Sequence, residues 1–150
     1  MNFKSLLATG CLVIAFSNAF AQTKTNKEGS GYVFTVEKQL GTSDVKNQGS
    51  TGTCWSFSSL SFLESEIERM GKGSVNLSEM YIARKAYEMK AEKYMRMMGK
   101  TNFSQGGAFH DVMNVIRQFG LMPDDSYTGL IYGQKRFHHT EMEKVMTDLL

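Results

Sequence analysis

Apolar residues recur every three or four positions in four stretches of the chain, and this spacing predicts four amphipathic helices. We expect them to begin at Cys54, after Ser78, near Gly107 and at Glu141. The stripes are Phe57, Leu60, Leu63 or Glu64, Ile67 and Met70 in the first stretch, Met80, Ala83, Tyr87, Ala91 and Tyr94 in the second, Phe109, Val112, Met113, Ile116 and Phe119 in the third, and Met142, Val145, Met146 and Leu149 in the last. Helices therefore account for most of the predicted structure.

Capping residues mark several of these helix boundaries. Thr53 and Ser78 stand where N-caps of the first and second helices are expected. Gly71 and Gly120 follow the first and third stripes, where a left-handed residue commonly ends a helix. The boundaries and the apolar spacing thus agree.

The remaining segments read as loops and one short extended run. Residues 22–30 are polar and predict a flexible leader, whereas 32–36 is a short β-like run. Residues 40–53 are rich in Gly, Ser, Thr and Asn and predict a loop. Residues 123–127 predict a turn.

The N-terminus has the pattern of a secretory signal peptide. Lys4 precedes an apolar run over 6–16, and small residues at 19 and 21 form a cleavage site after Ala21. A membrane anchor is the alternative, but the run is short for a bilayer span. A lipid-modified Cys11 is a further alternative, although the apolar run continues past it. We expect a signal peptide over 1–21, a leader over 22–40, a domain over 41–150, and a secreted or periplasmic location with no membrane span after cleavage.

Charge and cysteine content narrow the chemistry. The net charge is +2 and no basic block or stripe is present, so a nucleic-acid partner is not expected. Signal cleavage would remove Cys11 and leave Cys54 as a free thiol or an intermolecular partner. Cys54 and the three histidines lack ligand spacing, so we predict no metal, and no cofactor is expected.

Cys54 at the start of a predicted helix is either a nucleophile or a small buried residue. The positive end of the helix dipole favours a thiolate there, and the glycines before it allow a sharp turn and close substrate approach. An acyl intermediate also needs oxyanion donors, for which the Cys54 N–H and the Gln48 amide are candidates. The alternatives are an inert cysteine, a plain loop glutamine and a core tryptophan at Trp55.

The stretch 45–57, VKNQGSTGTCWSF, closely resembles the active-site segment of papain-like cysteine peptidases, V-x-N-Q-G-x-x-G-x-C-W-x-F. The resemblance implies that Cys54 is the nucleophile, that Gln48 completes the oxyanion hole, and that Trp55, which matches the tryptophan beside the nucleophile, takes part in substrate binding. It also implies an α+β papain-like fold, of which this chain covers mainly the helical N-terminal lobe.

Two later segments resemble the same family in order and spacing. Residues 77–79, LSE, are similar to its L-S-E-Q segment, and residues 105–107, QGG, are similar to its G-x-x-G-G segment. The second resemblance implies substrate binding by Gly106 and Gly107, with the backbone of Gly107 pairing with the substrate.

Within the family, the chain is most similar to the bleomycin hydrolase / aminopeptidase C branch. Thr51 stands where secreted members usually carry a disulfide-bonded cysteine, and no long propeptide separates the signal from the active-site segment. Residues 106–109 and 119–123 also resemble that branch. The resemblance implies an aminopeptidase acting on peptides, in many members a homo-hexamer.

A thiol peptidase also needs a base, usually a histidine. The family's histidine and asparagine would lie beyond Leu150, about 130–150 residues after the cysteine. His110, His138 and His139 receive no catalytic role: His110 is expected to be a solvent or packing residue, and the other two are expected in an exposed turn. The alternative to an enzyme is a catalytically incomplete fragment or a pseudoenzyme that acts as a binding domain.

Overall fold

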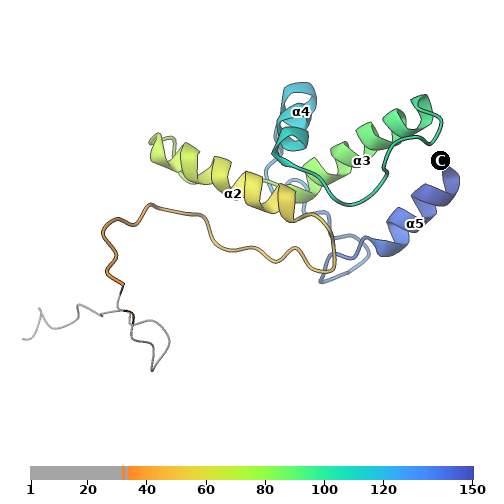
Figure 1. Ribbon diagram of the computed structural model, residues 1–150. Helices are drawn as coiled ribbons and strands as arrows, with labels where there is room; N and C mark the ends of the chain where they lie inside the picture. The colour runs from red at the N-terminus through yellow and green to blue at the C-terminus, as the bar shows by residue number, and fades with distance from the viewer. Residues whose placement is uncertain (1–31, 33) are drawn as a thin grey trace, which may run out of the picture. The chain divides into compact units, whose positions relative to one another are not determined.

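The computed structural model describes Tyr32 and residues 34–150, shown as a ribbon in Figure 1. The predicted signal peptide and residues 22–31 of the predicted leader lie outside the described residues. Residues up to Leu40 and residues from Gly41 to Leu150 form two separate units. In the first unit the Tyr32 ring stacks on Phe34 at 6.4 Å, but residues 32 and 34–36 form no strand. The predicted β-like run is therefore wrong for these residues, because an extended segment needs a paired neighbour to become a strand.

Helix α2, Cys54–Arg69, ends as the glycine pattern predicts. Gly71 has φ +71°, and its N–H donates to the Glu68 carbonyl at 2.9 Å. The N-terminal prediction is only half right. Thr53 occupies the N-cap position without a side-chain cap bond, because its hydroxyl pairs with that of Thr51 at 2.5 Å.

Helix α3, Glu79–Arg96, begins at the predicted cap. The Ser78 hydroxyl accepts a hydrogen bond from the Tyr81 N–H at 3.0 Å and donates one to the Tyr127 carbonyl at 2.5 Å. One side chain thus caps the helix and ties it to the turn that follows Pro123, where the predicted turn is present.

Helices α4, Phe109–Phe119, and α5, Thr140–Leu149, lie within two residues of their predicted starts. Asp111 accepts a hydrogen bond from the Ala108 N–H at 2.8 Å at the start of α4, and Gly120 ends it with φ +80°. In α5 no residue is buried, so its predicted apolar stripe does not form a core face within the described residues.

The core lies where α2, α3 and α4 meet. Leu60 of α2, Ile82 of α3, and Val112 and Val115 of α4 have no exposed surface. Figure 1 shows α4 (cyan) standing across the line of α2 and α3. This three-helix contact fixes the start of α2, where Cys54 lies.

The buried face of α2 matches the predicted stripe in part. Leu60 and Glu64 are buried as predicted, Trp55, Ser56 and Ser59 are buried as well, and Met70 at the end of the stripe is exposed. Glu64 points inward to a polar partner, which hydrophobic periodicity does not report.

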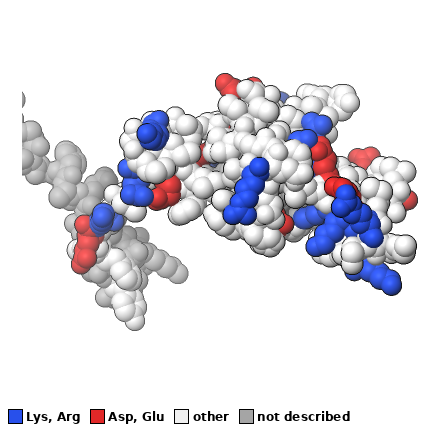
Figure 2. All heavy atoms as spheres, turned by 90° about the horizontal axis from the view of Figure 1, so that it is seen from above, with Lys and Arg blue, Asp and Glu red and all other residues white. Residues whose placement is uncertain are grey.

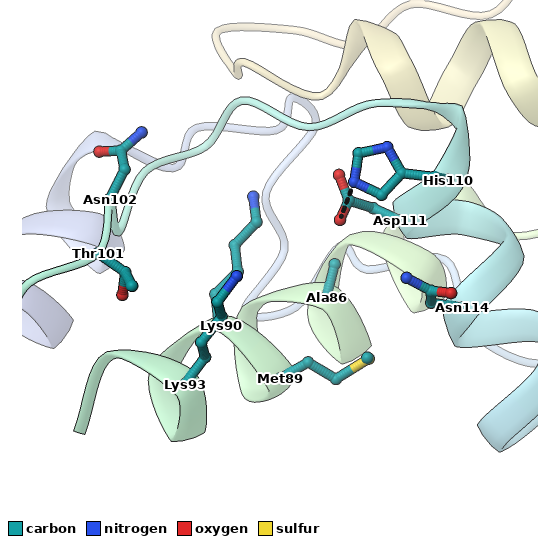
Figure 3. A pocket seen from close by; sticks show the side chains of 9 residues that line it. All are labelled: Ala86, Met89, Lys90, Lys93, Thr101, Asn102, His110, Asp111 and Asn114. Carbon is teal, nitrogen blue, oxygen red and sulfur yellow. Dashed lines mark ion pairs between the residues drawn. The ribbon is translucent and has the colours of Figure 1, made fainter. Parts of the chain in front are cut away.

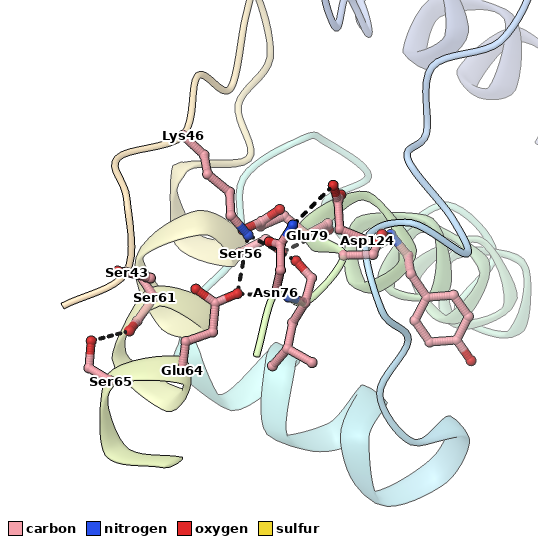
Figure 4. Close-up of polar contacts among 12 residues, drawn as sticks. Ser43, Lys46, Ser56, Ser61, Glu64, Ser65, Asn76, Glu79 and Asp124 are labelled. Atoms are coloured by element: carbon pink, nitrogen blue, oxygen red, sulfur yellow. Dashed lines mark hydrogen bonds and ion pairs between the residues drawn. The ribbon is translucent and has the colours of Figure 1, made fainter. Parts of the chain in front are cut away.

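That partner is Lys46, from the loop before α2 (Figure 4). Its ammonium lies 2.6 Å from Glu79 Oε1 and 3.1 Å from Glu64 Oε1, and it donates to the Leu77 carbonyl at 3.1 Å. Glu64 Oε1 also accepts from the Leu77 N–H at 2.7 Å. The Lys46 cluster, Lys46 with Glu64, Leu77 and Glu79, therefore joins the loop, α2 and the start of α3.

Burial and charge act in opposite directions on this cluster. Burial lowers the pKa of Lys46, but its hydrogen bonds and charge interactions with Glu79 and Glu64 outweigh burial and raise that pKa above 10.5. Burial raises the pKa of Glu79, and Lys46 offsets only part of that effect. One ammonium thus compensates two carboxylates that are almost fully buried.

No strand forms among the described residues; there are only two isolated β-bridges, Ser50 with His138 and Leu77 with Pro123. The predicted α+β fold therefore appears here only as its helical part. Figure 2 shows both acidic and basic side chains on one face, with uncharged surface between the charged groups. Within the described residues, no helix is long and apolar enough to cross a membrane, and no group of three His, Cys, Asp or Glu residues is placed to hold a metal.

Lys46→Met should destabilise the fold at pH 7, since removing one partner leaves buried carboxylates uncompensated. We expect a loss of about 2–3 kcal/mol, reduced because about a quarter of the lysine side chain is solvent-exposed. The folded-state pKa of Lys46 is raised, so its stabilising charge is fully present below pH 10.5 and is lost as pH rises through the folded-state value. Urea unfolding of the wild type and the variant from pH 7 to 12 should show a difference that shrinks above pH 10.5.

Lys72→Met is the matched control, because Lys72 is an exposed lysine just after α2. We expect its effect to stay within about 0.5 kcal/mol. Equal losses for the two variants would contradict the compensating role of Lys46.

Candidate functional site: the Gln48–Trp55 loop

The segment before α2 is a loop closed on itself. Asn47 Oδ1 accepts a hydrogen bond from the Gly49 N–H at 2.8 Å, and Gly49 has φ +65°, which favours glycine. Gln48 Nε2 donates to the Thr51 carbonyl at 2.7 Å, and the Thr51 hydroxyl donates to the Gln48 carbonyl at 2.8 Å. Residues 48 and 51 therefore hold each other, and the second N–H of the Gln48 amide remains for another acceptor.

A later segment supports this loop from outside. The Ser50 N–H donates to the Phe137 carbonyl at 2.9 Å, and the His139 N–H donates to the Ser50 carbonyl at 3.5 Å. A Cβ at Gly49 would lie 2.5 Å from the Phe137 oxygen, so only glycine permits this close approach. The segment before α5 thus packs directly on the loop that carries Gln48.

Cys54 is the first residue of α2, and its thiol is free and exposed. The first turn of a helix leaves N–H groups without intrahelical acceptors, and the helix dipole places positive charge there. The structure therefore presents the sulfur to solvent at a helix end that favours an anion. The alternative of a buried cysteine is therefore wrong, because Cys54 is exposed.

Trp55 points the other way, into the core, and contacts the glycine segment. Its indole Nε1 donates to the Gln105 carbonyl at 2.9 Å. A Cβ at Gly107 would lie 2.6 Å from the indole Cε2, whereas one at Gly106 would meet only Ser104 Oγ at 3.9 Å. The structure thus brings Trp55, Gly106 and Gly107 together, and Trp55 has the core position that was one of its predicted alternatives.

The three histidines lie in different environments. His110 is exposed, with 74% of its side chain accessible, 3.4 Å from Asp111, which agrees with the solvent alternative. His138 is exposed as predicted. His139 is half-buried, which corrects the expectation of an exposed turn residue, because its ring packs against Tyr87 at 6.1 Å.

Burial dominates the titration of the two residues in that ring contact. Burial lowers the pKa of His139, and the neighbouring His138 lowers it further, while Glu143 opposes both. Burial also raises the pKa of Tyr87, with a contribution from Glu143. His139 Nδ1 and the Tyr87 hydroxyl are buried without a hydrogen-bond partner in the described part of the chain. The His139 ring packs against Tyr87, and within the described residues no hydrogen bond joins it to Cys54, so the structure does not place it as a base for this thiol.

Two pockets flank the glycine segment. One, of about 390 Å³, borders Trp55 and is lined by Trp55, Ser58, Ser59, Phe62 and Phe109. The other, of about 470 Å³, lies between α3 and α4 (Figure 3) and is lined by Ala86, Met89, Lys90, Lys93, Thr101, Asn102, His110, Asp111 and Asn114. Trp55 lines only the first pocket, and Cys54 lines neither of the two.

Comparison with known proteins decides the family. A profile described as papain family cysteine protease matches residues 34–147, which include the loop, Cys54 and the glycine segment. The chain belongs to the papain family of cysteine proteases. Its helical described part is consistent with the helical N-terminal lobe expected from the sequence resemblance.

One relative supports the same assignment. A cathepsin L-like proteinase from Fasciola hepatica is 26% identical over 125 residues, which cover 81% of this chain and 32% of the relative. The chain thus spans about a third of the length of the relative that it matches. Neither comparison identifies a branch of the family.

Sequence reasoning missed the polar residues that hold the site. Lys46 lies two residues before Gln48, but no periodicity or motif marks a buried ion pair with Glu64 and Glu79. Gln105 was noted only as part of a motif, although its side chain accepts from the Gly52 N–H at 2.7 Å. The available signal was its position directly before two glycines, where close backbone approach is common.

Gly107→Ala should disturb Trp55, because the added methyl would overlap the indole, and we expect a loss of about 1–3 kcal/mol in stability. Trp55 is the only tryptophan in the chain, so its fluorescence maximum and intensity report the displacement directly.

Gly106→Ala is the matched control, since a Cβ there meets only Ser104 Oγ at 3.9 Å. Its fluorescence and melting temperature should stay close to those of the wild type. The packing argument fails if both alanine variants change the fluorescence equally.

Proposed function

We propose that this protein is a secreted thiol peptidase in which Cys54 attacks peptide bonds, and that it acts as an aminopeptidase. The observation that carries the proposal is the exposed, free Cys54 at the first residue of α2, directly after a loop closed by Gln48. Membership of the papain family of cysteine proteases supports the class of reaction.

In the proposed reaction the Cys54 thiolate forms a bond to the carbonyl carbon of the substrate. The π electrons of that carbonyl move to its oxygen, which becomes an oxyanion. Collapse of the intermediate breaks the C–N bond, and the departing amine takes a proton from a general acid. Water then attacks the thioester, releases the carboxylate product and restores the thiol.

Two donors near the loop suit the oxyanion. The Cys54 N–H lies at the open end of α2, where backbone donors point outward. Gln48 donates one amide N–H to the Thr51 carbonyl, and that bond orients the side chain so that the second N–H can serve as a donor to the oxyanion. Gly106 and Gly107 are proposed to bind the substrate backbone, and the Trp55 indole packs against Gly107.

The base and acid of this reaction require a histidine that the described residues do not place at Cys54. His110 is exposed beside Asp111, and the ring of His139 is packed against Tyr87. We therefore infer that the histidine, and an asparagine that orients it, come from chain beyond Leu150. The length of the cathepsin L-like relative, of which this chain covers 32%, is compatible with that inference.

The finer parts of the proposal rest on the sequence. Thr51 in place of a cysteine, and the 106–109 and 119–123 segments, support the bleomycin hydrolase / aminopeptidase C branch, with N-terminal residues of peptides as substrates and a homo-hexamer as the assembly. The apolar run before Ala21 supports secretion or export to the periplasm.

Cys54→Ser should reduce peptidase activity of the full-length protein to background, and Gln48→Ala should lower kcat by about 100-fold through loss of an oxyanion donor. Steady-state cleavage of fluorogenic peptides with free and blocked N-termini measures both effects. Preference for free N-termini would support the aminopeptidase assignment.

Gln134→Ala serves as the control for Gln48→Ala, because Gln134 is an exposed glutamine in the connector before α5. Undiminished turnover in the Cys54→Ser protein would rule out the nucleophile, and an unchanged kcat in Gln48→Ala would rule out the oxyanion role. Complete inactivity of the full-length wild type would favour a binding domain instead.

A further inference from the structure

Gln105 makes three directed contacts to segments that are far apart in the sequence. Its Oε1 accepts from the Gly52 N–H at 2.7 Å, its backbone carbonyl accepts from Trp55 Nε1 at 2.9 Å, and its Nε2 donates to Glu143 Oε2 at 2.6 Å. The first two contacts reach the residues on either side of Thr53 and Cys54. The third reaches α5.

We propose that Gln105 is a positioning residue that fixes the loop before Cys54, residues 48–53, relative to the substrate-binding glycines and couples both to Glu143 of α5. The inference rests on the proposed function, because it assigns Gln105 a part in holding the nucleophile and the substrate segment in register. Gln105 itself touches neither Cys54 nor a substrate.

The amide of Gln105 satisfies both of its side-chain partners. The Gly52 N–H requires an acceptor, and the Glu143 carboxylate requires a donor. The opposite orientation of the amide would set two donors against each other at Gly52 and two acceptors against each other at Glu143, so the partners fix the orientation. The bond to the carboxylate is charge-assisted and the stronger of the two.

Packing confirms how close the two segments lie. A Cβ at Gly52 would come within 2.8 Å of Gln105 Cβ, so the loop backbone lies directly against this side chain. Replacement of Gln105 therefore removes both a hydrogen bond and a contact surface two residues before Cys54.

Lys90 of α3 holds the same segment from its other side. Its ammonium donates to the Ser104 carbonyl at 3.1 Å and to the Gly106 carbonyl, and it lies 5.5 Å from the centroid of the Trp55 ring. Gln105 thus lies between two carbonyls that are fixed by one lysine. The segment that ends in Gly107 is held at three consecutive residues, which suits a rigid template for a substrate backbone.

The test uses a donor–acceptor exchange between positions 105 and 143 in the full-length protein. Gln105→Glu keeps an acceptor for the Gly52 N–H but sets two carboxylates against each other. The double variant Q105E/E143Q restores the bond with its direction reversed, because the amide at position 143 donates to the carboxylate at position 105. Gln105→Ala removes both side-chain bonds, and Glu143→Gln alone retains an acceptor for Gln105.

Two measurements follow the variants: kcat/KM for a peptide substrate and the hydrogen-exchange rate of the Gly52 amide. We expect kcat/KM to fall by about 10- to 100-fold in Gln105→Ala and Gln105→Glu, since misplacement near a nucleophile has effects of this size. We expect kcat/KM of the double variant to return to within a few-fold of the wild type, and kcat/KM of Glu143→Gln alone to stay within the same range. Alkylation of Cys54 by iodoacetamide, which uses no substrate backbone, should change little in any of them.

Matched controls separate positioning from charge alone. Gln118→Glu on α4 and Glu141→Gln on α5 make the same charge changes at exposed sites, and we expect wild-type kinetics from both. Circular dichroism confirms that each variant is folded before its kinetics are compared.

Failure of the inference is distinguishable from failure of the proposed function. If the full-length wild type cleaves no peptide, the proposed function fails, and Gly52 exchange alone decides the role of Gln105. Equal Gly52 exchange in the wild type and in Gln105→Ala overturns the inference. So does a folded double variant that remains as impaired as Gln105→Glu.

Discussion

The structure depends first on the compensation of two buried carboxylates by Lys46. Glu64 and Glu79 lie on different helices, and in a protein interior each would carry a large desolvation cost if it were unpaired. Lys46 reaches both and also the Leu77 carbonyl, so a loop residue joins α2 to the start of α3. Cys54 is the first residue of α2, and Gln48 follows Lys46 by two residues, so the positions of both depend on this cluster.

Hydrogen bonds then link the loop to segments that are distant in the sequence. Gln105 connects Gly52 with Glu143, and Ser50 exchanges backbone hydrogen bonds with residues 137 and 139. Glycine is required at positions 49 and 107, because a Cβ would collide with the Phe137 carbonyl in one case and with Trp55 in the other. The segments of the candidate site are therefore closely packed where they cross, and the Cys54 thiol is exposed.

Local signals made much of this predictable. The four helices, the cap at Ser78 and the glycine stops at Gly71 and Gly120 follow from side-chain chemistry that acts within a few residues. The ion pair that holds Glu64 inward and the burial of His139 do not, since both depend on partners far along the chain: Lys46 and Tyr87. The motif around Cys54 identified the family, but the role of Gln105 required three partners to be seen at once.

The central claim is that Cys54 is the nucleophile of a thiol peptidase, and covalent trapping tests it most directly. The full-length protein would be treated with a peptidyl epoxysuccinate, the adduct located by peptide mapping, and residual peptidase activity measured against the extent of labelling. We predict one adduct per chain, on Cys54, with activity lost in proportion to labelling. Peptidase activity that persists after complete alkylation of Cys54 would contradict the account.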